Sequence, residues 1–413
     1  MLGWSLATYD KFFSCLGGCR KGLFRARRNN AKCAAVASRR WSADDVVGFA
    51  PVPASAKESA PTRHRKIGPY RVLGELGRGG MALVYRGIHE LLQREVAIKE
   101  LLPESVRDRE TLSRFHREAL ALAAFRHQNI VTLYDLVEKN DSLFMVMEYV
   151  DGPTLASLLK DGPLPADVTA IIGANVASAL DHAHFGRIIH RDIKPANIMV
   201  NKAGEVKLMD FGIAKDEGLE QLTKEGIAIG TPSYMSPEQV TGQPLDPRTD
   251  MFSLGVVLYE CIAGQRPFLA NTAGEVFARI RDGKYAPLRK VAPHAPPPLE
   301  RIIHKAMRVR PSDRYPDAAE LRRDLELFLA RHVTISHAAL MIAFLRSRHH
   351  VTETEAAARL NGKELSFVET FEGAQRGGGR GWLAWAAAAL GAAGTALYLT
   401  QQHWLPLLET LRR

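Results

Sequence analysis

The stretch from His190 to Gly212 decides the fold of this chain. It reads His-Arg-Asp-Ile-Lys-Pro-Ala-Asn, then Ile-Met-Val, Asn-Lys-Ala-Gly-Glu, Val-Lys-Leu-Met and finally Asp-Phe-Gly. Two short apolar runs on either side of Asn-Lys-Ala-Gly predict a small β-hairpin. The hairpin presents Asn197 at one end and Asp210 at the other. Both side chains offer oxygen, which a hard cation such as Mg²⁺ requires.

The same stretch resembles the catalytic segment of the eukaryotic-type (Hanks-type) serine/threonine protein kinases found in bacteria. A lone Asp in a loop is usually a turn former, but the whole pattern favours the kinase interpretation. The resemblance implies an α+β fold with two lobes, a small antiparallel β-sheet lobe with one helix and a larger, mainly helical lobe. It also implies ATP and Mg²⁺ as cofactors, with Mn²⁺ as an alternative metal.

The resemblance also assigns roles to four residues of this stretch. Asp192 accepts the proton of the attacking hydroxyl, and Lys194 steadies the transferred phosphoryl group. Asn197 and Asp210 hold the metal ions that bridge the ATP phosphates.

A glycine-rich turn lies between two predicted strands, 70–76 and 83–88. Glycines let the backbone lie against phosphates with exposed N–H groups, although most such turns are simply hairpins. Val-Ala-Ile-Lys at 96–99 supports the phosphate interpretation, and Ala82 stands where the family has a third glycine. The residues that the resemblance places around the nucleotide here are Leu76, Gly77, Arg78, Gly79, Gly80, Met81, Ala82, Val84, Ala97 and Lys99.

Apolar residues at helical spacing predict a helix over about 107–125. Glu118 falls at the border of its buried stripe and can face inward, where it would pair with Lys99. A helical Glu is usually surface decoration, but the surrounding motifs favour the pair. Lys99 itself resembles the lysine that holds the α- and β-phosphates.

Two further strands are expected near 130–137 and 143–149. The second continues into a segment that resembles the hinge between the lobes. By analogy, the backbone of Glu148 and Val150 binds adenine, and Met147 lines the rear of that pocket. Met147 could equally belong to the ordinary core, and both can be true.

The segment from Gly212 to Glu238 resembles an activation loop. Thr231 resembles the threonine that braces Asp192 and Lys194 in enzymes that act on Ser and Thr. Thr223 is the first candidate for phosphorylation and Thr231 the second, because Arg191 beside the catalytic Asp could pair with a phosphate. An unmodified loop is the alternative.

Two features belong to the larger lobe. The run from Asp250 to Ile262 is apolar nearly all round, which predicts a buried central helix. Asp250 near its start resembles the family's anchoring aspartate. Arg314 matches the arginine that pairs with the activation-segment glutamate, here Glu238; a surface arginine is the alternative.

The net charge of +10 is concentrated in residues 1–66, which hold thirteen Lys and Arg against four Asp and Glu. We expect this basic arm to be mostly disordered; a grip on anionic lipid or nucleic acid is the alternative. The near-neutral remainder does not indicate nucleic-acid binding. The kinase domain is expected over 67–332, with lobes 67–150 and 151–332. The four cysteines lack metal-ligand spacing and fit a reducing compartment.

The chain beyond residue 332 holds a predicted juxtamembrane linker, partly helical, over 333–380. Residues 381–402 carry no Asp, Glu, Lys or Arg and have aromatic residues towards their ends, which predicts a transmembrane helix. A buried or amphipathic helix is the alternative. Gly391 and Thr395 are small residues four positions apart, a spacing compatible with a homodimer. A short tail, 403–413, follows, so we expect a single-pass protein of the cell inner membrane with a cytoplasmic kinase domain.

The sequence therefore predicts a membrane-tethered, autophosphorylating kinase that transfers the γ-phosphate of ATP to Ser or Thr of protein substrates. A kinase-like scaffold that binds nucleotide without turnover is a second hypothesis. A kinase acting on small molecules is a third, which the segment from Thr231 to Glu238 disfavours because it resembles a platform for protein substrates.

Overall fold

The computed structural model describes residues 66–79, 82–102, 108–139, 142–211, 232–362 and 364–365. Several predictions concern residues outside these ranges: the basic arm up to residue 65, the transmembrane helix 381–402, the tail 403–413, and Thr223. Three residues of the predicted site also lie outside them, namely Gly80, Met81 and Thr231.

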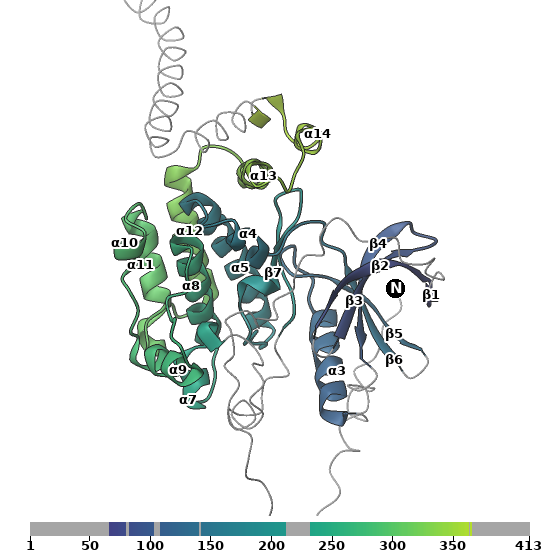
Figure 1. Cartoon of the computed structure of the whole chain (residues 1–413), viewed down its shortest axis with the longest axis horizontal. Coiled ribbons are helices and arrows are strands. Elements are labelled where there is room, and N and C mark those ends of the chain that lie inside the picture. Colours follow the sequence, from purple (N-terminus) through teal and green to yellow (C-terminus); the bar gives the residue numbers. More distant parts are fainter. Residues whose placement is uncertain are drawn as a thin grey trace, which may run out of the picture. The chain divides into compact units, whose positions relative to one another are not determined.

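The first part of the described chain forms an antiparallel sheet in the order β1-β2-β3-β4-β6-β5, which curls beside helix α3 (Figure 1). Its strands are β1 (Lys66–Ile67), β2 (Tyr70–Arg78), β3 (Ala82–His89), β4 (Arg94–Leu101), β5 (Leu133–Lys139) and β6 (Ser142–Glu148), and α3 covers Arg109–Ala124. Strand β6 is buried on both faces: Phe144 and Val146 join one core cluster, and Met145 and Met147 join the other. This explains why β6 reads as a continuous apolar run.

The second part is mainly helical, as the resemblance implied. Its longer helices are α5 (Ala166–Phe185), α8 (Arg248–Ala263), α9 (Ala273–Asp282), α11 (Pro297–Ala306) and α12 (Ala318–His332). Its shorter helices are α4 (Leu155–Lys160), α7 (Pro237–Thr241) and α10 (Leu288–Val291). Helix α8 is buried along nearly its whole length and lies against α5. The predicted central helix is therefore present, with Asp250 in its first turn.

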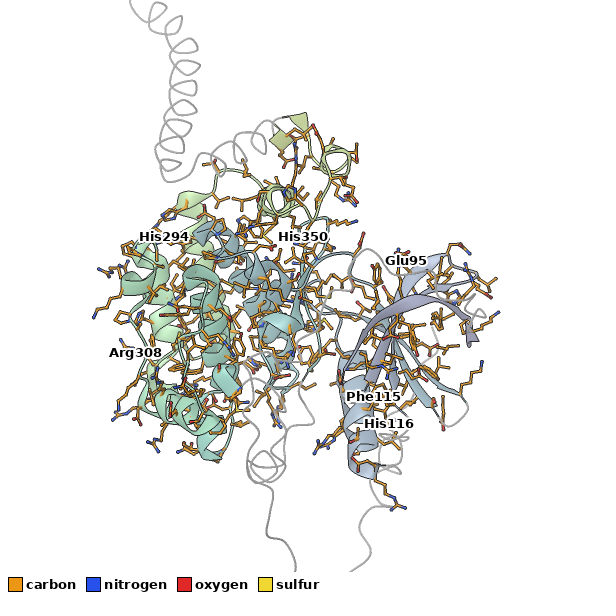
Figure 2. All side chains as sticks on the ribbon, in the orientation of Figure 1. Glu95, Phe115, His116, His294, Arg308 and His350 are labelled. Atoms are coloured by element: carbon orange, nitrogen blue, oxygen red, sulfur yellow. The ribbon has the colours of Figure 1, made fainter. Side chains whose placement is uncertain are left out.

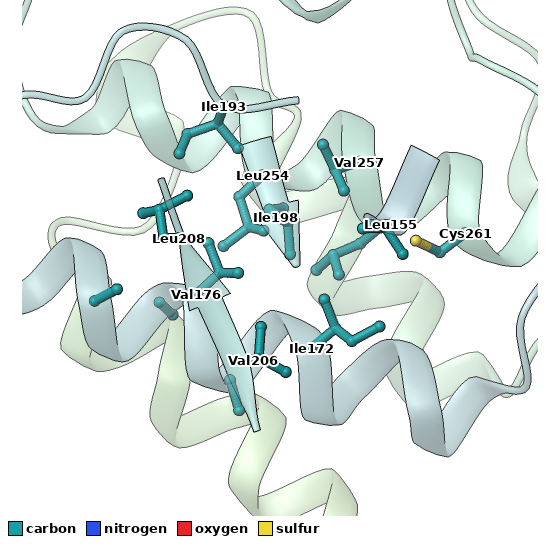
Figure 3. Close-up of a cluster of buried hydrophobic side chains, with 14 of the residues drawn as sticks. Leu155, Ile172, Val176, Ile193, Ile198, Val206, Leu208, Leu254, Val257 and Cys261 are labelled. Atoms are coloured by element: carbon teal, nitrogen blue, oxygen red, sulfur yellow. The ribbon is translucent and has the colours of Figure 1, made fainter. Parts of the chain in front are cut away.

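The predicted hairpin consists of β7 (Ile198–Val200) and β8 (Val206–Leu208), paired in register from Ile198 opposite Leu208. Its apolar side chains enter a core shared with α4, α5 and α8 (Figure 3). The loop before β5 is bonded to β8 as well: Leu208 N donates to Asn129 O at 2.8 Å, and Val131 N donates to Leu208 O at 3.0 Å. The hairpin is thus fixed between the helical part and the loop that follows α3.

Two more helices follow α12, namely α13 (His337–Ser347) and α14 (Glu353–Ala357). Of the linker predicted over 333–380, the structure describes 333–362 and 364–365, and these residues include both helices. The packing of α13 against α5 was not predicted, and α13 is buried in the same core as α5 and α8. Among the described residues, no single helix is long and apolar enough to span a bilayer. One pair of described helices, Pro311–His332 and His337–Ser347, is long and apolar enough only when the two are taken together, and the pair is bent by 78°.

Candidate active site

Lys99 stands at the centre of a three-residue ionic cluster. Its Nζ lies 2.9 Å from Glu118 Oε1 and 2.9 Å from Asp210 Oδ1. The predicted pair between Lys99 and Glu118 is therefore present. Burial disfavours the charge on Lys99, but the two carboxylates outweigh it and raise its pKa. Lys99 in turn keeps the pKa of Asp210 below its usual range although burial opposes this, so the pair is ionised at neutral pH.

Strand pairing sets the predicted nucleotide-lining residues around Lys99. Val84 on β3 pairs with Lys99 on β4, and Ala97 on β4 pairs with Met147 on β6. Because side chains alternate along a strand, Ala97 and Lys99 face the same side of the sheet. Leu76, Gly77 and Arg78 end β2, Gly79 follows, and Ala82 begins β3. Gly79 N donates to Ala82 O at 2.8 Å, which closes the glycine-rich turn.

The loop before β7 brings Asp192, Lys194 and Asn197 together. Lys194 Nζ lies 3.0 Å from Asp192 Oδ2. Asn197 Nδ2 donates to the backbone oxygen of Asp192 at 2.9 Å and to its Oδ2 at 3.2 Å. The Asp192 carboxylate is thereby held by two donors, and the amide oxygen of Asn197 takes part in neither bond.

Asp250 fixes the shape of this loop from helix α8. Its carboxylate is fully buried and accepts from His190 N and from Arg191 N, each at 2.8 Å. His184 Nε2 lies 2.8 Å from the same carboxylate. Arg191 has φ +65°, an unusual conformation for a non-glycine residue, and the Asp250 bond to its amide holds it there. The anchoring role expected for Asp250 thus has a visible geometric basis.

His190 connects this loop to the end of β8. Its Nδ1 accepts from Asp192 N at 3.2 Å, so its Nε2, 3.2 Å from Met209 O, is the protonated nitrogen. Burial lowers its pKa, which agrees with a neutral ring. Phe211 packs against His190 with ring centroids 4.5 Å apart, and Asp210 beside it has φ +54°. These contacts fix the direction of Asp210 towards Lys99.

The expected hinge follows β6. Met147 is buried in the larger core, so its place in the core is established, and Val150 is buried nearby. The Glu148 side chain has partners that the sequence did not reveal: Lys207 Nζ lies 2.6 Å from Oε1, and Thr132 N donates to Oε2 at 3.2 Å. The only sequence signal for this contact was a Lys in the middle of a short apolar strand. The bond ties the end of β6 to β8.

Glu238 and Arg314 form the second predicted ion pair. Arg314 Nη1 and Nη2 each lie 2.7 Å from one Glu238 oxygen, a bidentate contact between buried groups. Thr249 Oγ1 donates to the same carboxylate at 2.7 Å. Ser236 caps α7 by accepting from Gln239 N. This cap supports the helix that carries Glu238.

The described residues contain no group of three or more His, Cys, Asp and Glu side chains suited to a metal. Asn197 and Asp210 together still offer an amide oxygen and a carboxylate. Mg²⁺ commonly takes only one or two such protein ligands and completes its shell with phosphates and water. These two residues therefore fit a metal that arrives with a nucleotide.

The curled sheet, the helical part and the ionic cluster around Lys99 define a protein-kinase architecture. Residues 70–324 match the family model described as the protein kinase domain. The chain therefore belongs to the protein kinase family.

Its relatives are bacterial serine/threonine-protein kinases. The chain is 43% identical over 263 residues to PknB of Mycolicibacterium smegmatis, covering 61% of this chain and 42% of PknB. It is 37% identical over 263 residues to PrkC of Bacillus subtilis, covering 63% of this chain and 41% of PrkC. The crystal structure of the Mycobacterium tuberculosis PknI kinase domain is similar, with TM-score 0.51 and 26% identity, over 65% of this chain and 99% of that domain. The chain thus spans about two fifths of the length of PknB and PrkC.

Proposed function

We propose that this chain is an ATP- and Mg²⁺-dependent kinase that transfers the γ-phosphate to Ser and Thr hydroxyls of proteins. One observation carries the proposal: Lys99 is paired with Glu118 and with Asp210, while Asp192 is held by Lys194 and Asn197 on the neighbouring loop. The names of PknB and PrkC, both serine/threonine-protein kinases, support the same activity. The kinase domain in this proposal covers 67–332.

Each residue has a definite task in the proposed reaction. Lys99, held by Glu118, binds the α- and β-phosphates. Asp192 orients the acceptor hydroxyl and takes its proton, and Lys194 neutralises charge on the transferred group. Mg²⁺ bound at Asn197 and Asp210 would neutralise charge on the phosphates. Most of the rate enhancement then comes from positioning and electrostatics, because the protein forms no covalent intermediate.

The test is incubation of the purified protein with γ-labelled ATP and a generic protein acceptor. We expect label on Ser and Thr from the wild type, and its loss in Asp192→Asn. Asp282→Asn is the matched control, because Asp282 lies on the protein surface and forms ion pairs with its sequence neighbours Arg281 and Lys284. Bound nucleotide without transfer by the wild type would instead support the scaffold hypothesis, and label on small molecules alone would support the third.

Autophosphorylation in the activation segment is part of the proposal, with Thr223 as the first acceptor and Thr231 as the second. The support is Arg191, which directly precedes Asp192 and whose guanidinium would pair with a phosphate on this segment. Phosphopeptide mapping of the active enzyme tests this. An active enzyme with a bare segment contradicts it.

We also propose that residues 381–402 tether the kinase to the inner membrane as a single span, with the kinase domain in the cytoplasm. The support is the uncharged sequence of 381–408 and its interfacial aromatic residues. Homodimerisation through the small residues Gly391 and Thr395 extends this proposal. Fractionation of cells expressing the full chain tests it: recovery in the salt-washed membrane is expected, and recovery in the supernatant contradicts the tether.

A further inference from the structure

The helices after α12 are folded onto the helical part although they lie beyond residue 324, where the family match ends. In α13 the consecutive residues 339–345 are all buried. Arg348 then donates to the backbone oxygen of Asp161, and to that of Pro163 at 2.9 Å. His350, labelled in Figure 2, lies 3.9 Å from the Asp161 carboxylate. We call residues 337–360 the C-terminal brace.

The brace touches the turn between β7 and β8. Gly204 in this turn has φ +80°, and a Cβ atom there would lie 2.8 Å from Ala338 O and 2.9 Å from Met341 Cβ. Both distances are too short for a real side chain, so glycine is what lets the turn rest on α13. The contact fixes the tip of the hairpin whose ends carry Asn197 and Asp210.

Lys202, in the same turn, joins the brace to the hinge. Its backbone N donates to Asp151 O at 2.9 Å, and its Nζ lies 3.3 Å from Asp151 Oδ2. The same Nζ lies 2.9 Å from Oε1 of Glu355 in α14. A bond from the backbone N of Thr352 and the bond from Lys202 lower the pKa of Glu355 to about 2, so this carboxylate is charged at neutral pH.

Asp151 directly follows Val150, whose backbone is proposed to bind adenine. The next residue, Gly152, lies so close to the hairpin that a Cβ atom would be 2.0 Å from Val200 O. Val200 N also donates to Pro153 O at 3.0 Å. The hinge end, the hairpin and Lys202 therefore form one connected unit, and Glu355 holds that unit from outside.

We propose that Lys202 is a positioning residue for the nucleotide, and that the C-terminal brace holds Lys202 in place through Glu355. This inference rests on the proposed ATP-dependent function. Lys202 acts through Asp151 and the hairpin and does not touch the nucleotide. Loss of its bonds should therefore weaken nucleotide binding more than the transfer step.

The test compares the full chain with its Lys202→Met and Glu355→Gln variants. We expect the Kd for Mg·ATP, measured by calorimetry with a non-hydrolysable analogue, to rise about threefold to tenfold in each. The kcat at saturating ATP should change by less than about twofold, because ground-state and transition-state binding are weakened together. The double variant should bind no worse than Lys202→Met alone, since both changes break one chain of contacts.

Lys284→Met is the matched control, because Lys284 forms an ion pair of similar length, 3.0 Å, with Asp282, the last residue of α9. It should leave Kd unchanged. Lys202→Arg should restore most of the affinity, since Arg can reach both carboxylates. An unchanged Kd in Lys202→Met, with or without a lower melting temperature, overturns the inference.

The wild type separates this inference from the proposed function. Mg·ATP binding without phosphate transfer defeats the proposed kinase activity and leaves the comparison of Kd values valid. Phosphate transfer with equal Kd values in all variants defeats only the role of Lys202. A wild type that binds no nucleotide defeats both.

Discussion

Lys99 and Arg314 each meet a carboxylate from a distant part of the chain, but the two cations have very different surroundings. Arg314 is fully buried, and each of its five N–H groups has an acceptor. Two go to Glu238, and the others go to the backbone oxygens of Arg248, Arg308 and Val309 at 2.7–2.9 Å. Nothing is left for a ligand to bind.

The cluster around Lys99 is open by comparison. Lys99 divides its ammonium group between two carboxylates, and the Asp210 side chain is 35% exposed, whereas that of Glu238 is 4% exposed. Water or a metal can therefore replace Lys99 at Asp210, but nothing can replace Arg314 at Glu238. A saturated ion pair stabilises the fold, and an unsaturated one leaves room for chemistry.

The largest expected effect breaks the saturated pair. Arg314→Met leaves the Glu238 carboxylate buried without its main partner, so the free energy of unfolding should fall by about 3–5 kcal/mol. Urea unfolding followed by circular dichroism measures this. Arg281→Met, which removes an exposed arginine, is the control and should change stability little. A loss in Arg314→Met no larger than in the control would contradict the comparison.

The second prediction concerns the open cluster. Lys99→Met should lower phosphate transfer by about a hundredfold to a thousandfold, because a preorganised charge near the phosphates is lost. Its free energy of unfolding should fall less than that of Arg314→Met, since the Asp210 side chain is 35% exposed. Radiolabel transfer and urea unfolding on the same sample test both parts, and unchanged transfer would remove Lys99 from the active site.

A milder change sharpens the comparison. Glu118→Gln leaves Lys99 paired with Asp210 but removes the carboxylate that holds the other side of its ammonium group. We expect transfer to fall by about tenfold, through misplacement of Lys99. Steady-state kinetics should show this loss of transfer, and urea unfolding should show no matching loss of stability. A variant as inactive as Lys99→Met would mean that Glu118 does more than hold Lys99.

The smallest effect is a pH dependence at His190. Its folded pKa is lowered from about 6.5 by burial, so the unfolded chain takes up a proton before the folded one does. Above pH 6.5 the His190 ring is neutral in both states. As the pH falls below 6.5, the free energy of unfolding decreases by up to about 1.4 kcal/mol per pH unit. Unfolding curves from pH 7.5 to 5.5 measure the slope, which should be flatter in His190→Gln. Equal slopes would show that His190 does not contribute.

The sequence predicted the local motifs and the pairs they imply. The hairpin from Ile198 to Leu208, the pair of Lys99 with Glu118 and the pair of Arg314 with Glu238 are all present. These features depend on short, fixed spacings or on a family pattern that already contains the contact.

Contacts of the brace could not be predicted in this way. Residues 333–375 carry no recognisable motif, and the surface that buries α13 is made by α5 and by the turn at Gly204, far earlier in the chain. The bond between Lys207 and Glu148 was missed for the same reason. A lysine in a three-residue strand shows nothing of its partner until two distant segments are side by side.

The bonds between β8 and the loop after α3 have a mechanical consequence. Asn129 and Val131 fix the loop that follows α3 to the helical part, so this loop is the point about which a rotation of α3 would turn. Glu118 lies partway along the helix, at a distance from that loop. A small rotation of α3 about this loop would separate Glu118 from Lys99, while the hairpin, Phe211 and Asp210 keep their places. One rigid rotation of the helix would therefore break the pair of Lys99 with Glu118, with no element unfolded.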